Sequence, residues 1–451
     1  MNKERTAIAK LLQRHFHPES TLDLTVTERT FPLRVRADLQ RTVDRFFSEG
    51  ITVVHFCGMF QRYDHEGLKF CHLIGADEDH FPVSVPPEYE EVDIGEQKSV
   101  RCLKNGLWLL TNDEVNFAVL SSPGATYGAD GLGLTFQIAT AKGEAGSRIT
   151  HEFFEHLEES VLRAESYREK ILSLAEEDSY SGSATGITVH QLRAVARQDV
   201  ILPTRTLDLL DRNVIDFVRH RPRLAQFGLS TKKGVLFYGP PGTGKTHTIH
   251  YLAGALEGHT TFLVAAEQVG RIGEYMTLAR LLQPSLVIIE DVDLIARDRD
   301  TMSSPCEEAL LNKLLNEMDG LRPDADILFV LTTNRPETLE SALASRPGRV
   351  DQAIEFPLPD DDGRAKLIRL YCHGLSVPED VVRATVKKTE KVSAAFIKEL
   401  MRRSAQFHLE RQGQSGEVTL EDVENALEEL LVTGGSLNRI LLGADVDETG
   451  E

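Results

Sequence analysis

The segment GPPGTGKT at residues 239–246 constrains this chain more than any other feature. It follows the apolar run VLFY, opens a helical pattern, and satisfies G-x-x-x-x-G-K-[ST] in the strand–loop–helix context that this motif requires. Its glycines let backbone N–H groups point inward at phosphate oxygens beside a helix N-terminus. The motif therefore predicts a phosphate-binding loop (P-loop) built from Gly239, Pro240, Pro241, Gly242, Thr243, Gly244, Lys245 and Thr246. We expect Lys245 to reach the β- and γ-phosphates and the hydroxyl of Thr246 to ligate Mg²⁺.

Two adjacent carboxylates, Glu290 and Asp291, follow the apolar run 286–289. A P-loop enzyme needs one carboxylate to hold Mg²⁺ through water and another to orient and deprotonate the attacking water. Successive strand residues point in opposite directions, so two neighbouring acids can serve different partners. The predicted metal-binding set is therefore Thr246, Glu290 and Asp291, and the sequence leaves open which acid is the base.

Short apolar segments alternate with helical patterns over residues 200–360. This alternation is typical of a parallel sheet covered by helices on both faces. Residues 361–435 have helical apolar spacing, and the Gly-rich, acidic residues 436–451 are expected to form a flexible tail. The expected strands lie at 235–238, 261–264, 286–289, 327–331 and 353–356. The predicted fold class is α/β, a P-loop core with its parallel sheet flanked by helices.

Residues 1–149 combine a helical pattern at 36–49 with short β-branched or aromatic runs, which predicts an N-terminal α+β domain. These runs lie at 51–56, 100–103, 107–110, 117–120 and 134–138. Residues 150–199 are predicted to be a helical connector and linker. A heptad stripe there predicts one long helix from Thr150 to about Glu177, packed on a neighbouring element or paired between subunits. The Ser/Gly-rich residues 179–186 are then expected to be a flexible linker.

The charge balance argues against a chain held on nucleic acid or anionic lipid, because 50 Lys and Arg face 70 Asp and Glu, a net charge of −20. Five scattered cysteines without a CxxC motif favour a reducing, cytoplasmic location. No apolar run approaches the ~18 residues of a membrane helix. We therefore expect neither a membrane nor a nucleic-acid partner.

Five motifs in order resemble the core clade of the AAA ATPases, over a region from about residue 200 to 431. They are GPPGTGKT, LVIIEDVD, LLNEMDG at 314–320, TTN at 332–334 and SRPGR at 345–349. The resemblance implies ATP and Mg²⁺ as cofactors, a C-terminal helical lid at 361–435, and self-association into a ring, usually a hexamer.

The resemblance also implies roles for individual residues. Asn334 matches the polar sensor that positions the lytic water near the γ-phosphate. Arg346 and Arg349 match the paired arginine fingers that reach into the next subunit's nucleotide site, where a guanidinium is worth ~10³–10⁵ in rate. The predicted catalytic set is therefore Glu290, Asp291, Asn334, Arg346 and Arg349.

The chain departs from the family pattern at several positions. The acids stand in the order Glu-Asp where Asp-Glu is usual. The family's axial loop carries an aromatic–apolar–Gly triplet that grips a threaded polypeptide, and the best match here is residues 271–273, Arg-Ile-Gly, without an aromatic. Phe396 stands where the lid helix usually has an acid. Residues 199–202, Asp-Val-Ile-Leu, replace the usual Asp-Ile-Gly-Gly, although Val200 and Ile201 could still pack on adenine.

These patterns predict a ring-forming ATPase that hydrolyses ATP and remodels or unfolds protein partners, with a client or adaptor bound by the N-terminal domain. The alternative is a nucleotide-dependent scaffold or switch with little turnover, which the reversed acids and the missing aromatic favour. A nucleic-acid-remodelling ATPase is a further alternative, opposed by the acidic charge balance.

Overall fold

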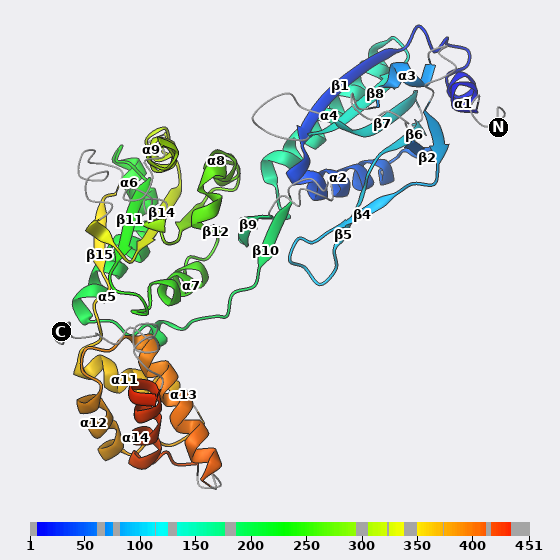
Figure 1. The fold of residues 1–451 in the computed structure, drawn as a ribbon. Helices are drawn as coiled ribbons and strands as arrows, with labels where there is room; N and C mark the ends of the chain where they lie inside the picture. The colour runs from blue at the N-terminus through cyan, green and yellow to red at the C-terminus, as the bar shows by residue number, and fades with distance from the viewer. Residues whose placement is uncertain are drawn as a thin grey trace. The chain divides into compact units, whose positions relative to one another are not determined.

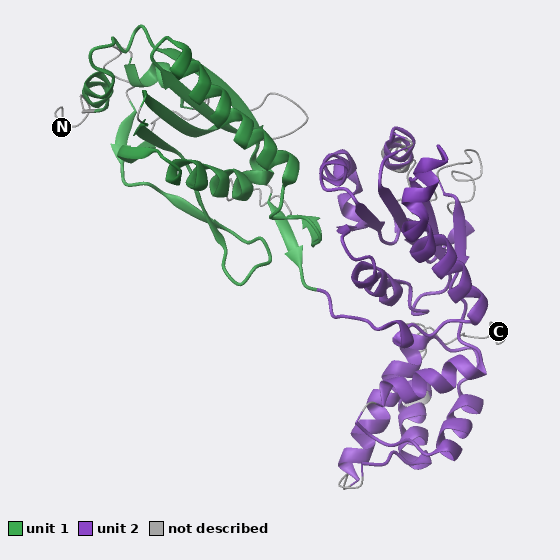
Figure 2. Cartoon of the chain, turned by 180° about the vertical axis from the view of Figure 1, so that it is seen from behind, with its two compact units in different colours: residues 1–191 green, residues 192–451 purple. Residues whose placement is uncertain are grey.

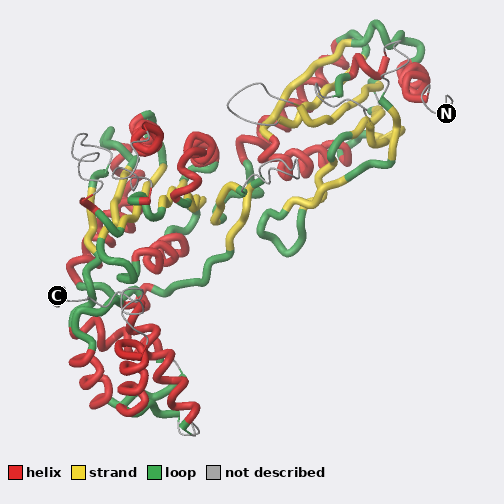
Figure 3. The backbone as a smooth tube through the Cα atoms, in the orientation of Figure 1, coloured by secondary structure: helices red, strands yellow, loops and turns green. Residues whose placement is uncertain are grey.

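The computed structural model describes residues 7–60, 68–74, 82–112, 114–124, 133–175, 186–294, 305–322, 324–337, 350–372, 374–411 and 416–433. The chain divides into two compact units, Met1–Gln191 and Leu192–Glu451, which are coloured separately in Figure 2. Each unit combines helices and strands (Figure 3). Each unit is described by itself below.

Unit 1 is built on an antiparallel sheet with strand order β1–β8–β7–β6–β2–β3 (Figure 1). Its strands are β1 (Thr25–Pro32), β2 (Thr52–Phe60), β3 (Val83–Val85), β6 (Gly106–Thr111), β7 (Asn116–Gly124) and β8 (Gly133–Thr140). A separate antiparallel pair joins β4 (Tyr89–Val92) to β5 (Val100–Leu103). The helices are α1 (Ala7–Phe16), α2 (Arg36–Ser48), α3 (Phe70–Ile74) and α4 (Glu144–Arg163). The helix and the β-runs expected before residue 149 are confirmed.

Apolar side chains are buried on both faces of this sheet, and strand β6 shows how. Leu107 and Leu109 point to one face, where they join Leu12 of α1 in a buried cluster. Trp108 points to the opposite face and contacts Phe47 of α2, with 5.4 Å between the ring centroids. The alternation of side chains along one strand therefore supplies both cores.

The long helix predicted from Thr150 to about Glu177 is wrong. Helix α4 begins earlier, at Glu144, and ends at Arg163, because Ala164 adopts a left-handed backbone with φ 41°. The apolar residues beyond it form β9 (Ile171–Leu174), which pairs with β10 (Ile187–His190). Backbone pairing with a segment distant in sequence overrides the helical spacing. Most of the expected linker lies outside the described residues.

Unit 2 has a parallel sheet in which the strands run in the order β12–β13–β14–β11–β15. They are β11 (Lys233–Tyr238), β12 (Thr260–Val264), β13 (Ser285–Ile289), β14 (Ile327–Thr333) and β15 (Gln352–Glu355). The five expected strands are confirmed. Parallel strands place all their carboxyl ends at one edge, and the P-loop, the acidic pair and Asn334 all follow such ends.

Helices cover both faces of the unit 2 sheet. One face carries α5 (Thr204–Leu210), the π-helical turn η3 (Asp211–Ile215), α6 (Asp216–Gln226) and α7 (Lys245–Ala255). Leu210 and Ile249 from this layer share a buried cluster with Phe237 and Ile288 of the sheet. The other face carries α8 (Ile272–Leu281) and α9 (Pro305–Asp319).

Four further helices enclose a separate apolar core and form the lid. They are α11 (Asp361–Tyr371), α12 (Glu379–Lys388), α13 (Ala394–Glu410) and α14 (Leu420–Glu428), followed by the turn η6 (Glu429–Thr433). The starts of α11 and α14 are capped by side chains: Asp360 accepts from the N–H of Gly363, and Thr419 and Asp422 form a capping box. The helical character expected for this region is confirmed.

Candidate functional site

The P-loop connects β11 to α7 with a backbone that requires glycine. Gly239 has φ 145°, and a Cβ there would lie 2.2 Å from the carbonyl oxygen of Phe356. Gly242 has φ 76°, and a Cβ there would approach Ser393 Oγ and Ala395 Cβ to 2.9 Å. Since L-residues with a side chain rarely adopt this backbone, the glycine spacing of the motif is a direct requirement of the loop.

Lys245, at the start of α7, lies inside the loop. Its Nζ donates to the carbonyl oxygens of Gly239 and Pro240, at 2.8 and 2.9 Å, while Thr243 Oγ1 also donates to Pro240 O at 2.9 Å. Burial lowers the pKa of Lys245 to about 8, although the negative charge of Asp291 opposes the shift. The ammonium group is thus poorly solvated, and a phosphate would replace weak carbonyl partners by a charged one.

Thr246 and Glu290 lie side by side at the ends of two different elements. Thr246 Oγ1 donates to Glu290 Oε1 at 2.8 Å, and both side chains are at least partly exposed. A hydroxyl and a carboxylate are the hard oxygen ligands that Mg²⁺ prefers. The pair fits a magnesium ion shared with phosphate oxygens.

Asp291 pairs instead with Asn334. Asn334 Nδ2 donates to Asp291 Oδ1 at 3.0 Å, and the Asp291 N–H donates to Thr332 Oγ1 at 3.0 Å. Asp291 has a left-handed backbone, with φ 49°, a conformation in which Asp and Asn are the commonest non-glycine residues. The bend turns this carboxylate away from Thr246, so the two adjacent acids face different partners.

Asp293 is a site residue that the sequence reasoning missed. It is 1% exposed, and its Oδ1 accepts from Thr333 Oγ1 at 3.0 Å and from the Asn334 N–H at 3.1 Å. This buried carboxylate fixes the strand end that carries Asn334. The sequence feature that could have identified Asp293 is its place in Glu-Asp-Val-Asp, two residues after Asp291.

Comparison with known families agrees with this geometry. Residues 235–358 match the family described as "ATPase family associated with various cellular activities (AAA)". Residues 235–358 are an AAA domain.

Relatives with the AAA domain align over about half of this chain. Proteasome-activating nucleotidase of Methanothermobacter thermautotrophicus is 33% identical over 235 residues, which are 49% of this chain and 56% of that protein. The same protein of Methanopyrus kandleri is 34% identical over 233 residues, 49% and 53% of the two chains. ATP-dependent zinc metalloprotease FtsH of Thermus thermophilus is 30% identical over 248 residues, 52% and 39%. The chain thus spans about half the length, or less, of these relatives.

The lid contacts the P-loop of the AAA domain directly. The N–H of Ala395, at the start of α13, donates to the carbonyl oxygen of Gly242 at 3.0 Å. Ser393 caps the same helix by accepting from the N–H of Phe396 at 3.1 Å. Phe396 itself is fully buried in the lid core, which accounts for an apolar residue at this position. The small residues at 393–395 allow the close approach.

Residues 199–202 bridge the lid and the sheet. Ile201 packs against the lid cluster, whereas Leu202 packs against the cluster below the sheet, and Val200 is 3% exposed. The carbonyl oxygen of Asp199 is hydrogen-bonded to the ring of His247, the residue directly after the P-loop. The sequence drew attention to Val200 and Ile201 but not to His247. The role of Val200 and Ile201 at adenine stays a prediction.

The axial triplet of residues 271–273 does not present its apolar side chain. Ile272 is fully buried at the start of α8, and Arg271 pairs with Glu274 at 3.2 Å. The preceding 3-10 turn, η4 (Ala266–Arg271), runs straight into α8. Lys313 of α9 donates to the carbonyl oxygen of Gly270 at 2.8 Å and ties this turn down. Ile272 is therefore a core residue.

Arg346 and Arg349 lie outside the described residues, so their role remains a prediction.

Within the described residues, no helix is long and apolar enough to cross a membrane.

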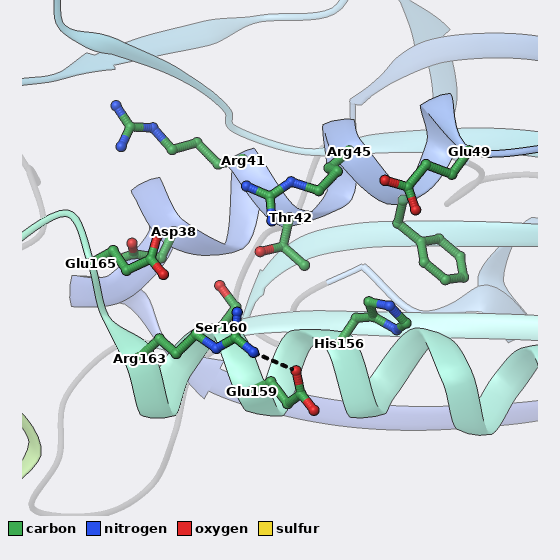
Figure 4. Close-up of a pocket in the computed structure, with 11 residues that line it drawn as sticks. Asp38, Arg41, Thr42, Arg45, Glu49, His156, Glu159, Ser160, Arg163 and Glu165 are labelled. Carbon is green, nitrogen blue, oxygen red and sulfur yellow. Dashed lines mark hydrogen bonds and ion pairs between the residues drawn. The ribbon is translucent and has the colours of Figure 1, made fainter.

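A polar groove lies between α2 and α4 of unit 1 (Figure 4). Arg41 is paired with Glu96 at 2.9 Å and Arg163 with Glu159 at 3.2 Å. The guanidinium of Arg45 has no ion pair with any described residue. Figure 4 shows side chains of both helices facing this groove.

Proposed function

We propose that this protein is a Mg²⁺-dependent ATP hydrolase that assembles into a ring and remodels or unfolds protein partners. The observation that carries the proposal is the division of the acids: Glu290 lies with Thr246, and Asp291 lies with Asn334. Two carboxylates in two environments are what metal binding and water activation require. ATP hydrolysis by the AAA relatives supports the same reaction.

Each residue of the site has a proposed role in the reaction. Lys245 binds the β- and γ-phosphates, while Thr246 and Glu290 would hold Mg²⁺, which neutralises charge on the phosphate oxygens. Asn334 and Asp291, joined at 3.0 Å, hold the attacking water in line with the γ-phosphate. Asp291 accepts the proton of that water as its oxygen bonds to phosphorus and ADP leaves. Asp291 is therefore the proposed base, and Glu290 the proposed metal ligand.

Steady-state phosphate release by the full chain tests this function. Wild type is expected to turn over ATP, whereas Lys245→Ala and Asp291→Asn are expected to fall at least 100-fold. Equal, slow release by all three proteins would contradict hydrolysis and favour the scaffold or switch. The buried Ile272 is the observation that favours this second candidate, because the axial segment offers no apolar side chain for gripping a polypeptide.

The proposed ring, a hexamer by the resemblance, requires Arg346 and Arg349 to act on a neighbour's nucleotide. Mixing Arg349→Ala with Lys245→Ala protein then restores part of the activity, because some interfaces combine an intact finger with an intact P-loop. A mixture no more active than its parents would argue against shared sites.

Unit 1 is proposed to bind the client or adaptor, with the α2–α4 groove as the contact surface. Arg45 offers a guanidinium there that forms no ion pair among the described residues, a good partner for a carboxylate on another protein. Arg45→Glu is expected to abolish stimulation of turnover by a client and to leave basal turnover unchanged. Retained stimulation would exclude this groove. The four cysteines whose side chains the structure describes, Cys57, Cys71, Cys102 and Cys372, are free, which agrees with a cytoplasmic location.

A further inference from the structure

His247 links the P-loop helix to a segment 48 residues earlier in the chain. Its ring Nε2 lies 3.2 Å from the carbonyl oxygen of Asp199. A carbonyl oxygen can only accept, so Nε2 must carry the hydrogen. The contact therefore defines the tautomer of the ring and fixes Asp199 against the start of α7.

Three elements contribute groups around the ring of His247: α7 contributes His250, the lid helix α13 contributes Lys398, and the segment before the P-loop contributes Asp199. Burial lowers the pKa of His247 from its ordinary value, His250 and Lys398 act in the same direction, and Asp199 opposes them.

The segment that His247 holds is anchored on both sides. Arg197 pairs with Asp211 at 2.7 Å and lies over the ring of Tyr251 on α7, 5.9 Å from its centroid. Beyond Asp199, residues 200–202 are packed between lid and sheet. The carbonyl of Asp199 lies between these anchors, and the ring of His247 is its side-chain partner.

The phosphate position proposed above leaves one place beside the P-loop for the nucleoside. The γ-phosphate end is marked by Asp291 and Asn334, so ribose and base must leave the loop at its other end. There the lid contacts Gly242, and residues 199–202 reach α7 at His247. Three elements thus surround the expected site of the base.

We propose that His247 is a positioning residue for the nucleoside half of the substrate: its hydrogen bond holds the Asp199–Val200 backbone against the adenine. The inference rests on the proposed ATP-binding function and extends it to base recognition. His247 then contributes to the affinity for a nucleotide but not to the affinity for a bare triphosphate, which contacts only the P-loop.

Calorimetric titration of the full chain with ATP and with inorganic tripolyphosphate, under non-turnover conditions without Mg²⁺, tests this. His247→Leu is expected to weaken ATP binding about two- to tenfold, the effect of one hydrogen bond, and to leave tripolyphosphate binding unchanged. His247→Gln keeps an N–H donor at the place of Nε2 and is expected to restore most of the ATP affinity. His250→Leu, one turn further along α7, is the matched control and should bind both ligands as wild type does.

Several outcomes would overturn the inference. Unchanged ATP affinity in His247→Leu, or equal weakening for ATP and tripolyphosphate, would mean that the contact does not serve the base. Failure of His247→Gln to restore affinity, or an equal loss in His250→Leu, would show a general effect on α7. If wild type binds neither ligand, the proposed function itself fails, and that result is distinct from all the others.

Discussion

Two regions of the AAA domain keep the family pattern to different degrees: the edge of the sheet where the P-loop and the two acids lie, and the axial triplet at residues 271–273. At the edge, Lys245, Thr246 and Asn334 keep the family's residue types and lie in a geometry that suits the proposed hydrolysis, even though the order of the two acids is reversed. In the axial segment the aromatic is absent and the apolar residue, Ile272, is buried. The comparison teaches that the parts for chemistry and the parts for gripping can change independently within one domain.

The geometry of the reversed acids shows how they fit the proposed roles in hydrolysis. Glu290 is one methylene longer than Asp and reaches Thr246, while the left-handed backbone of Asp291 turns the shorter acid to Asn334. Side-chain length and backbone direction thus compensate each other. No similar compensation replaces a gripping side chain, because a buried residue cannot contact a substrate.

The largest expected effect tests the chemical half of this comparison, namely the proposed roles of the two acids. Asp291→Asn is expected to lower kcat about 10²–10⁴-fold, the contribution of a general base, with nucleotide affinity retained. Glu290→Gln should instead raise the Mg²⁺ concentration needed for half-maximal rate. Rapid-quench and steady-state kinetics over a Mg²⁺ series measure both. If the two variants exchange these behaviours, the proposed roles of the acids are reversed.

A second prediction concerns the axial side. Ile272→Ala is expected to lower the free energy of unfolding by about 2–5 kcal/mol, because it leaves a cavity under α8. Arg271→Ala removes a partly exposed ion pair and should cost under ~1 kcal/mol. Urea unfolding compares them. A stable Ile272→Ala protein that hydrolyses ATP but no longer processes a client would assign gripping to this residue after all.

The smallest expected effect is a pH dependence that sharpens the role of Lys245. Its pKa is about 8 without ligand, and a bound triphosphate must raise it. Below pH 8 the lysine is charged in both states, so ATP affinity is flat. Above pH 8 binding requires proton uptake, and affinity falls by up to about tenfold per pH unit. Calorimetry in buffers of different ionisation enthalpy should detect uptake at pH 8.5 but hardly any at pH 7, and equal uptake at both would contradict this assignment.

Local motifs allowed much of unit 2 to be predicted. The P-loop glycines, the strand ends and the lid helices depend on short stretches of chain, and the parallel sheet then brings Asp291 to Asn334 across 43 residues. Which partner each of the two acids contacts could not be predicted, because it depends on the backbone angle of a single residue, Asp291.

The errors and omissions have a common cause. The heptad stripe after Thr150 could not reveal that Ala164 ends the helix, or that Ile171 pairs with His190. His247 contacts Asp199, which is distant in the chain, so no local pattern marks it. Long-range contacts override local spacing in each case.

The connection from unit 1 to the nucleotide has a mechanical consequence. Unit 1 ends at Gln191, and Asp199 follows eight residues later, a tether of at most ~29 Å when fully stretched. If unit 1 holds a client as proposed, a load on that client would be transmitted along the chain to residues 199–202, which contact His247. Tension from unit 1 and nucleotide in the proposed site would then act on the same short piece of backbone.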